Sequence, residues 1–187
     1  MKKEIFTKKK IIHLLGLLSQ ELEKQDLKGE ILIVGGSAMV IAFKARISTK
    51  DVDAIFEPKS KIYEISHRIA RSQNLPENWL NDAVKGFMSE KAEYRIFLDL
   101  PALKVYIPIP GYIFAMKAIS MRIAPDSSDV EDLKLLIGIL KIKALNEGID
   151  IIKQYYPENL IPQRTYYALD EIINAVLVDN GVRKPGS

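Results

Sequence analysis

The stretch Ile31-Leu-Ile-Val-Gly35-Gly-Ser37 begins with four β-forming apolar residues, which are followed directly by two glycines and a serine. Four such residues in succession predict a buried strand, and the glycines allow a tight turn after it. Serine is a preferred helix N-cap, so we expect a helix from Ser37 to about Lys44. The stretch therefore predicts a strand, a turn and a helix in succession.

A pair of carboxylates follows in Asp51-Val-Asp53-Ala-Ile-Phe56, after the intervening residues 38–50. The apolar residues predict a strand from Val52 to Phe56, in which residues two apart point to the same side. Asp51 and Asp53 would then present both carboxylates from one face, where they repel each other unless a cation lies between them. Oxygen ligands favour Mg²⁺ or Mn²⁺, so the pair predicts a metal site.

Composition limits the classes of protein that this chain can belong to. Its 187 residues suffice for one sizeable domain, or for a compact core with a helical extension. A formal charge of +3 is too small to indicate a nucleic-acid binder, and the absence of cysteine excludes disulfides and thiolate metal sites. No stretch approaches the ~20 apolar residues of a membrane span. We expect a cytoplasmic protein without a membrane partner.

Hydrophobic periodicity outlines the remaining elements. Helices are predicted over residues 9–25, 61–73, 111–123, 129–145, 148–156 and 163–179, and further strands over 94–98 and 103–109. Pro108 and Pro110 indicate that the last strand lies at an edge or ends there. These elements predict an α/β (α+β) protein, with a small mixed sheet and helices over one face in residues 1–110. A C-terminal helical region, residues 111–187, would pack on this core, with nucleotide bound in a cleft between them.

The glycine turn is suited to phosphate. Gly35 and Gly36 let the backbone approach an anion closely, and a helix opening at Ser37 would offer unpaired N–H groups and a hydroxyl. Each motif is a weak signal alone, since a glycine turn is a common folding device and paired aspartates often lie on a solvated edge. The combination at this spacing is much more specific.

Gly36-Ser37, the spacer 38–50 and Asp51-Val-Asp53 together resemble the signature of the nucleotidyltransferase superfamily of polymerase-β-like fold. The segment Arg46-Ile-Ser-Thr49-Lys-Asp51-Val-Asp53 resembles the prokaryotic branch that includes the AbiEii-type abortive-infection toxins. The resemblance implies a nucleotidyltransferase-like core that uses Mg²⁺ and an NTP. By this resemblance the catalytic metal-binding pair is Asp51 and Asp53, and the nucleotide-binding residues are Gly35, Gly36, Ser37, Arg46 and Thr49.

The second half of the chain extends the resemblance, because a strand leads into a helix that carries Lys117, followed by Asp129-Val-Glu-Asp132. The branch implies that Lys117 contacts the triphosphate, and that Asp129 or Asp132 orients it or serves the transfer chemistry. Two structural alternatives stay open at this point. Asp126, Asp129 and Asp132 could be helix-capping residues, and Lys117 could be a solvated helix lysine.

The chain departs from the superfamily pattern in one respect. Many members carry a third carboxylate on a later strand, whereas residues 102–109 contain no Asp or Glu. Asp99 or Glu93 could substitute. Two functions therefore stay open. The first is transfer of NMP from an NTP to an RNA (tRNA) or protein acceptor, in a toxin–antitoxin or phage-defence setting with an antitoxin-like partner. The second is a catalytically inactive nucleotide- or partner-binding module.

Overall fold

A computed structural model describes residues 4–121 and 127–181 of the chain. The chain divides into two compact units. Unit 1 consists of Met1–Gly86 and Tyr94–Pro108, and unit 2 of Phe87–Glu93 and Ile109–Ser187.

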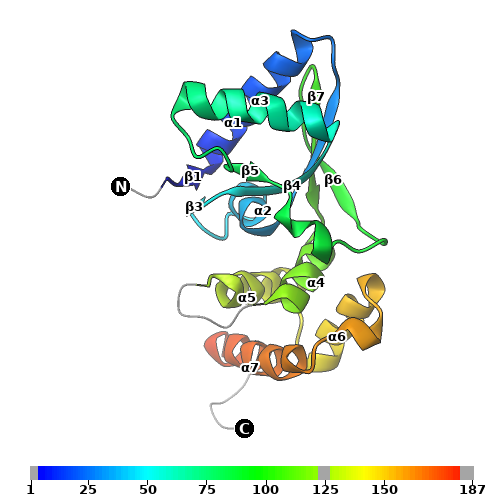
Figure 1. Cartoon of the computed structure of the whole chain (residues 1–187). Helices are drawn as coiled ribbons and strands as arrows, with labels where there is room; N and C mark the ends of the chain where they lie inside the picture. The colour runs from blue at the N-terminus through cyan, green and yellow to red at the C-terminus, as the bar shows by residue number, and fades with distance from the viewer. Residues whose placement is uncertain (1–3, 122–126, 182–187) are drawn as a thin grey trace. The chain divides into compact units, whose positions relative to one another are not determined.

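Unit 1 contains a mixed five-stranded sheet, as predicted, with the strand order β5-β4-β2-β7-β6 (Figure 1). The strands are β2 (Gly29–Ile33), β4 (Val52–Glu57), β5 (Leu80–Asn81), β6 (Tyr94–Asp99) and β7 (Leu103–Pro108). Central strand β2 pairs antiparallel with β4 and parallel with β7. The strands predicted around Ile31–Val34 and Val52–Phe56 are therefore neighbours at the centre of the sheet.

Helices α1 (Lys8–Glu23) and α3 (Lys59–Gln73) lie side by side and pack against the sheet (Figure 1). Their buried residues recur at helical spacing: Ile11, Leu14, Leu15, Leu18 and Leu22 on α1, and Ile62, Ile65 and Ile69 on α3. These positions were expected from periodicity, and they complete the apolar core of unit 1.

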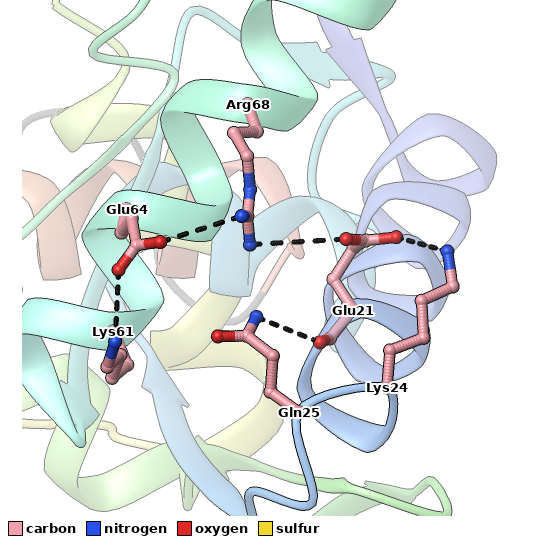
Figure 2. Close-up of polar contacts among 6 residues, drawn as sticks. All are labelled: Glu21, Lys24, Gln25, Lys61, Glu64 and Arg68. Carbon is pink, nitrogen blue, oxygen red and sulfur yellow. Dashed lines mark hydrogen bonds and ion pairs between the residues drawn. The ribbon is translucent and has the colours of Figure 1, made fainter.

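Polar side chains join the outer surfaces of the same two helices (Figure 2). Arg68 on α3 lies 3.5 Å from Glu64 and 4.0 Å from Glu21 on α1. A shallow groove of about 230 Å³ lies beside them, lined by Leu17, Glu21, Arg68, Ile69, Ser72 and Gln73. All three charged groups are partly exposed, so the ion pairs add little stability. None of the predicted site residues lines this groove.

Of the two possibilities that the prolines indicated for the last strand, an edge position or a strand end, the structure shows the strand end. β7 is an interior strand between β2 and β6, although it does end at Pro108. The proline is accommodated at the strand end, where a missing N–H removes no bond from the middle of the ladder. The edge strands are β6 and the short β5, for which the sequence pattern predicted no element.

The helix after the glycine turn also differs from expectation. Helix α2 spans Gly35–Ile41, with Val34 as its N-cap, so Ser37 lies inside the helix. It ends before Lys44, which adopts a left-handed backbone with φ of 53°. Backbone geometry at the turn therefore starts the helix two residues earlier than the side-chain preference of serine indicated.

Unit 2 is helical, with α4 (Pro110–Ser120), α5 (Asp129–Leu140), α6 (Leu145–Tyr155) and α7 (Gln163–Asp179). The four helices match the four predicted from periodicity, although α4 and α5 end earlier than expected. Arg122 and the predicted cap Asp126 lie outside the described residues. Across the described ranges, no helix has both the length and the apolar character needed to traverse a membrane.

Candidate nucleotide and metal site

The glycine turn lies directly against Asp53. The Val34 N–H donates to the Asp53 carbonyl at 2.9 Å, which places the end of β2 beside β4. Gly35 adopts a φ of +58°, and a Cβ atom on it would lie 2.8 Å from Oδ2 of Asp53. Position 35 therefore requires glycine for two reasons, the left-handed backbone and the close approach of the carboxylate.

Arg46, before β3 (Ser48–Thr49), and Thr49, at the end of β3, reach the same turn. A Cβ atom on Gly36 would lie 2.8 Å from Oγ1 of Thr49 and 3.4 Å from Cζ and Nη2 of Arg46. The turn therefore packs against a hydroxyl, a guanidinium and a carboxylate at once. The structure brings Gly35, Gly36, Arg46, Thr49 and Asp53 together in unit 1.

The expectation that Asp51 lies in a strand is wrong. β4 begins at Val52, whose N–H donates to the Trp79 carbonyl at 2.7 Å, and Asp51 occupies the bend before it. Within β4 the residues alternate, with Val52 and Ala54 buried and Asp53 partly exposed. The strand ladder thus orients Asp53, whereas Asp51 depends on the bend between β3 (Ser48–Thr49) and β4.

Ser37 is fully buried, and its hydroxyl donates to the Val34 carbonyl at 2.8 Å. The prediction that it caps the helix is wrong, because Val34 occupies that position. A hydroxyl has one proton to donate, and here that proton is directed at the backbone of the turn. Ser37 therefore fixes the shape of the glycine turn from inside.

Lys117, Asp129 and Asp132 form an ion cluster in unit 2. Nζ of Lys117, on α4, lies 2.8 Å from Oδ1 of Asp129 and 2.7 Å from Oδ2 of Asp132, both on α5. Lys117 is 7% exposed and Asp132 2%, so the alternative of a solvated lysine is wrong. Both aspartates also lie in the first turn of α5, where the helix dipole stabilises negative charge. Ser128 occupies the N-cap position, without a side-chain cap hydrogen bond, so the capping alternative is wrong for Asp129 and Asp132, whereas the dipole interaction and lysine binding coexist.

Asp99 cannot supply the missing third carboxylate. Asp99 on β6 pairs with Lys104 on β7, and Lys104 pairs with Glu30 on β2. Glu30 in turn pairs with Glu57 on β4, so these four residues lie in one row across the sheet. Asp53 precedes Glu57 by four residues, or about 13 Å along β4. Asp99 therefore lies at the other end of the sheet, three strands away from Asp53.

The position in line with Asp53 is occupied by Pro108. Leu32 pairs with Tyr106, so the parallel register continued by two residues sets Val34 beside Pro108. No group of three or more His, Cys, Asp or Glu side chains suited to a metal ion occurs in the described ranges 4–121 and 127–181. The sheet thus offers a proline where a third ligand would be expected.

Glu93, the other candidate, belongs to unit 2 and forms a hydrogen bond with the Tyr155 hydroxyl. Burial, with this hydrogen bond and the nearby negative charge adding to it, raises the pKa of Tyr155 to about 12. Burial likewise raises the pKa of Tyr156. Glu93 therefore serves the tyrosine cluster of unit 2.

We expect the free energy of unfolding to fall as pH rises from 10 to about 12, the pKa of Tyr155. The unfolded chain releases the tyrosine proton first, so the stabilisation is complete below pH 10 and is lost above it. Urea unfolding between pH 9 and 11.5 measures this slope. Tyr155→Phe should flatten it relative to Tyr167→Phe, a change at an exposed tyrosine. Equal slopes in the two variants would contradict the role of Tyr155.

The mixed sheet, the glycine turn and the adjacent aspartate make unit 1 a small α+β core of the nucleotidyltransferase type. The sequence model of a family described as "Nucleotidyltransferase of unknown function (DUF6036)" matches residues 9–174. This span covers most of the chain, including the glycine turn with Asp53 and the Lys117 cluster, so the chain belongs to that family. No curated protein and no solved structure gives a significant match. The likeness to the AbiEii-type branch stays a prediction.

Proposed function

We propose that the chain transfers NMP from an NTP to an acceptor in a reaction that depends on Mg²⁺ or Mn²⁺. Membership of a nucleotidyltransferase family supports an NTP as substrate. The observation that carries the proposal is the close approach of Asp53 to Gly35, which places a carboxylate against the glycine turn. The acceptors that we propose are an RNA end, such as that of tRNA, or a protein hydroxyl.

The donor set fits a hard divalent cation. Asp51 and Asp53 supply carboxylate oxygens, and a triphosphate would complete an oxygen shell. Such a cation, when bound, neutralises charge that develops on the transferred phosphoryl group. Arg46 places a guanidinium beside Gly36, a geometry that suits phosphate oxygens. Thr49 adds a hydroxyl donor at the same turn.

The Lys117 cluster has a less direct role in this proposal. One ammonium and two carboxylates give it a net negative charge, which disfavours a triphosphate. Lys117 would have to exchange one aspartate for a phosphate in order to bind it. We therefore assign Asp129 and Asp132 the role of holding Lys117 in position, and we treat its phosphate contact as part of the test.

A second candidate is nucleotide binding without turnover. The occupation of the third-carboxylate position by Pro108, and the distant location of Asp99, favour this alternative. A toxin or phage-defence setting with an antitoxin-like partner rests on the resemblance of the Arg46–Phe56 segment alone.

The test incubates the purified chain with Mg²⁺, each α-labelled NTP in turn and total tRNA, and follows label into RNA and protein fractions. Asp51→Ala/Asp53→Ala should lose transfer, whereas Asp99→Ala, at the other end of the sheet, should retain it. Lys117→Arg should show whether transfer persists when a guanidinium replaces the ammonium of the Lys117 cluster. Equal transfer by the double variant would contradict the metal assignment. Intact Mg²⁺–NTP binding without transfer would favour the binding module.

A further inference from the structure

Three of the proposed site residues lie within the five residues from Thr49 to Asp53. Thr49 ends β3 and Asp53 belongs to β4, so only Lys50 and Asp51 lie outside strand pairing. The position of the Asp51 carboxylate therefore depends on how the two flanking strands are held.

On the N-terminal side, β3 is held by the start of the chain. Strand β1 (Phe6–Thr7) pairs antiparallel with it, with Phe6 opposite Thr49 (Figure 1). Thr7 is also the N-cap of α1, where its side chain accepts a hydrogen bond from the Lys10 N–H at 3.3 Å. Because α1 is anchored in the core, β1 gives the loop before Asp51 a fixed partner.

On the C-terminal side, the Trp79 carbonyl accepts the Val52 N–H at 2.7 Å. The indole N–H of Trp79 donates to the Ser66 carbonyl of α3 at 3.0 Å. The ring of Trp79 stacks on that of Phe6, with centroids 6.3 Å apart and an interplanar angle of 23°. Phe6 is 0% exposed and Trp79 1%. One buried aromatic contact thus connects the partner of β3 to the partner of β4, the two strands that flank Asp51.

We propose that Phe6 and Trp79 are positioning residues for the metal–nucleotide site, and this inference rests on the proposed function. Neither ring is placed in the site itself. Their contact fixes the distance between the partners of Thr49 and Val52, and so the course of the bend that carries Asp51. Since mutation of residues that orient metal ligands typically costs roughly 10- to 100-fold in metal affinity, loss of the stack should weaken Mg²⁺–NTP binding by about 10- to 100-fold.

The experiment measures binding of each labelled NTP with Mg²⁺ by equilibrium dialysis, beside urea unfolding of the same proteins. Phe6→Leu keeps an apolar side chain but removes the ring, and Leu18→Ala on α1 is the control for lost core packing. Trp79→Phe keeps an aromatic ring against Phe6, whereas Trp79→Leu does not. We expect weaker binding in Phe6→Leu and Trp79→Leu, and binding within about 3-fold of wild type in Leu18→Ala and Trp79→Phe.

Trp79 also provides a spectroscopic readout, because it is the only tryptophan of the chain. Its emission should change as Mg²⁺–NTP binds to the wild type, and this change should be absent in Asp53→Asn. Equal affinities in Phe6→Leu and Leu18→Ala, or in Trp79→Phe and Trp79→Leu, would overturn the positioning role. Absence of binding in the wild type, or unchanged binding in Asp53→Asn, would overturn the proposed function instead.

Discussion

Replacement of Gly35 by alanine is expected to weaken Mg²⁺–NTP binding by about 100-fold, because it displaces the carboxylate that would hold the metal. The added Cβ would lie 2.8 Å from Oδ2 of Asp53, closer than such contacts occur. The left-handed backbone at φ of +58° adds about 1–2 kcal/mol of strain for a residue with a side chain. Equilibrium dialysis with labelled NTP measures the binding, and urea unfolding measures the stability.

Gly16→Ala is the matched control for this substitution. Gly16 lies within α1, where a Cβ would meet no atom within 4 Å, so alanine should raise helix stability by about 0.5–1 kcal/mol. Its NTP affinity should equal that of the wild type. Gly36→Ala should act through Oγ1 of Thr49 and give an intermediate loss. Wild-type affinity in Gly35→Ala would refute a nucleotide site at this turn.

The second large effect is expected in unit 2. Lys117→Met should lower the free energy of unfolding by about 3–5 kcal/mol, because it leaves the buried carboxylate of Asp132 and the partly exposed one of Asp129 without their cation. Asp132 is 2% exposed and Asp129 is next to it in the first turn of α5, so water cannot readily replace the ammonium. Urea unfolding followed by circular dichroism measures the loss.

A paired change separates lost charge balance from lost packing. Lys117→Met/Asp132→Leu removes both members of the more buried pair and should recover most of the stability, since replacing a whole buried ion pair by apolar groups is often neutral. Lys134→Met breaks the exposed pair with Glu131 on the same helix and should cost less than about 1 kcal/mol. A cost for Lys117→Met as small as that for Lys134→Met would contradict the structural role of the cluster.

Local pattern predicted the central features of unit 1. The apolar run before Gly35 and the alternation around Asp53 contain their own strand signals, so both strands and the mixed sheet followed from the sequence. The adjacency of Gly35 and Asp53 was implied by the resemblance of the two motifs to the nucleotidyltransferase signature. These features depend on residues that are neighbours in the sequence or that belong to one recognisable signature.

Features that depend on distant pairing could not be predicted in this way. Two-residue β1 has no periodicity, and nothing in the sequence near Phe6 indicates that it pairs with Thr49. The interior place of β7 arises from parallel pairing with β2, which local sequence does not specify. Lys117 was compatible with either a solvated or a paired state, and only the burial of its helix distinguishes them.

The path of the chain between its two units has a consequence for how the protein can be divided. The chain crosses from one unit to the other three times, after Gly86, after Glu93 and after Pro108. Ser89, in the short middle segment, uses its backbone N–H and its hydroxyl to bind Tyr112 and Tyr155, both far along the chain. Truncation after Pro108 would remove Tyr112 and Tyr155, so Ser89 would lose both of these hydrogen-bond partners. The helical unit therefore includes Phe87–Glu93, which precede β6, so cleavage after Pro108 does not separate two intact units.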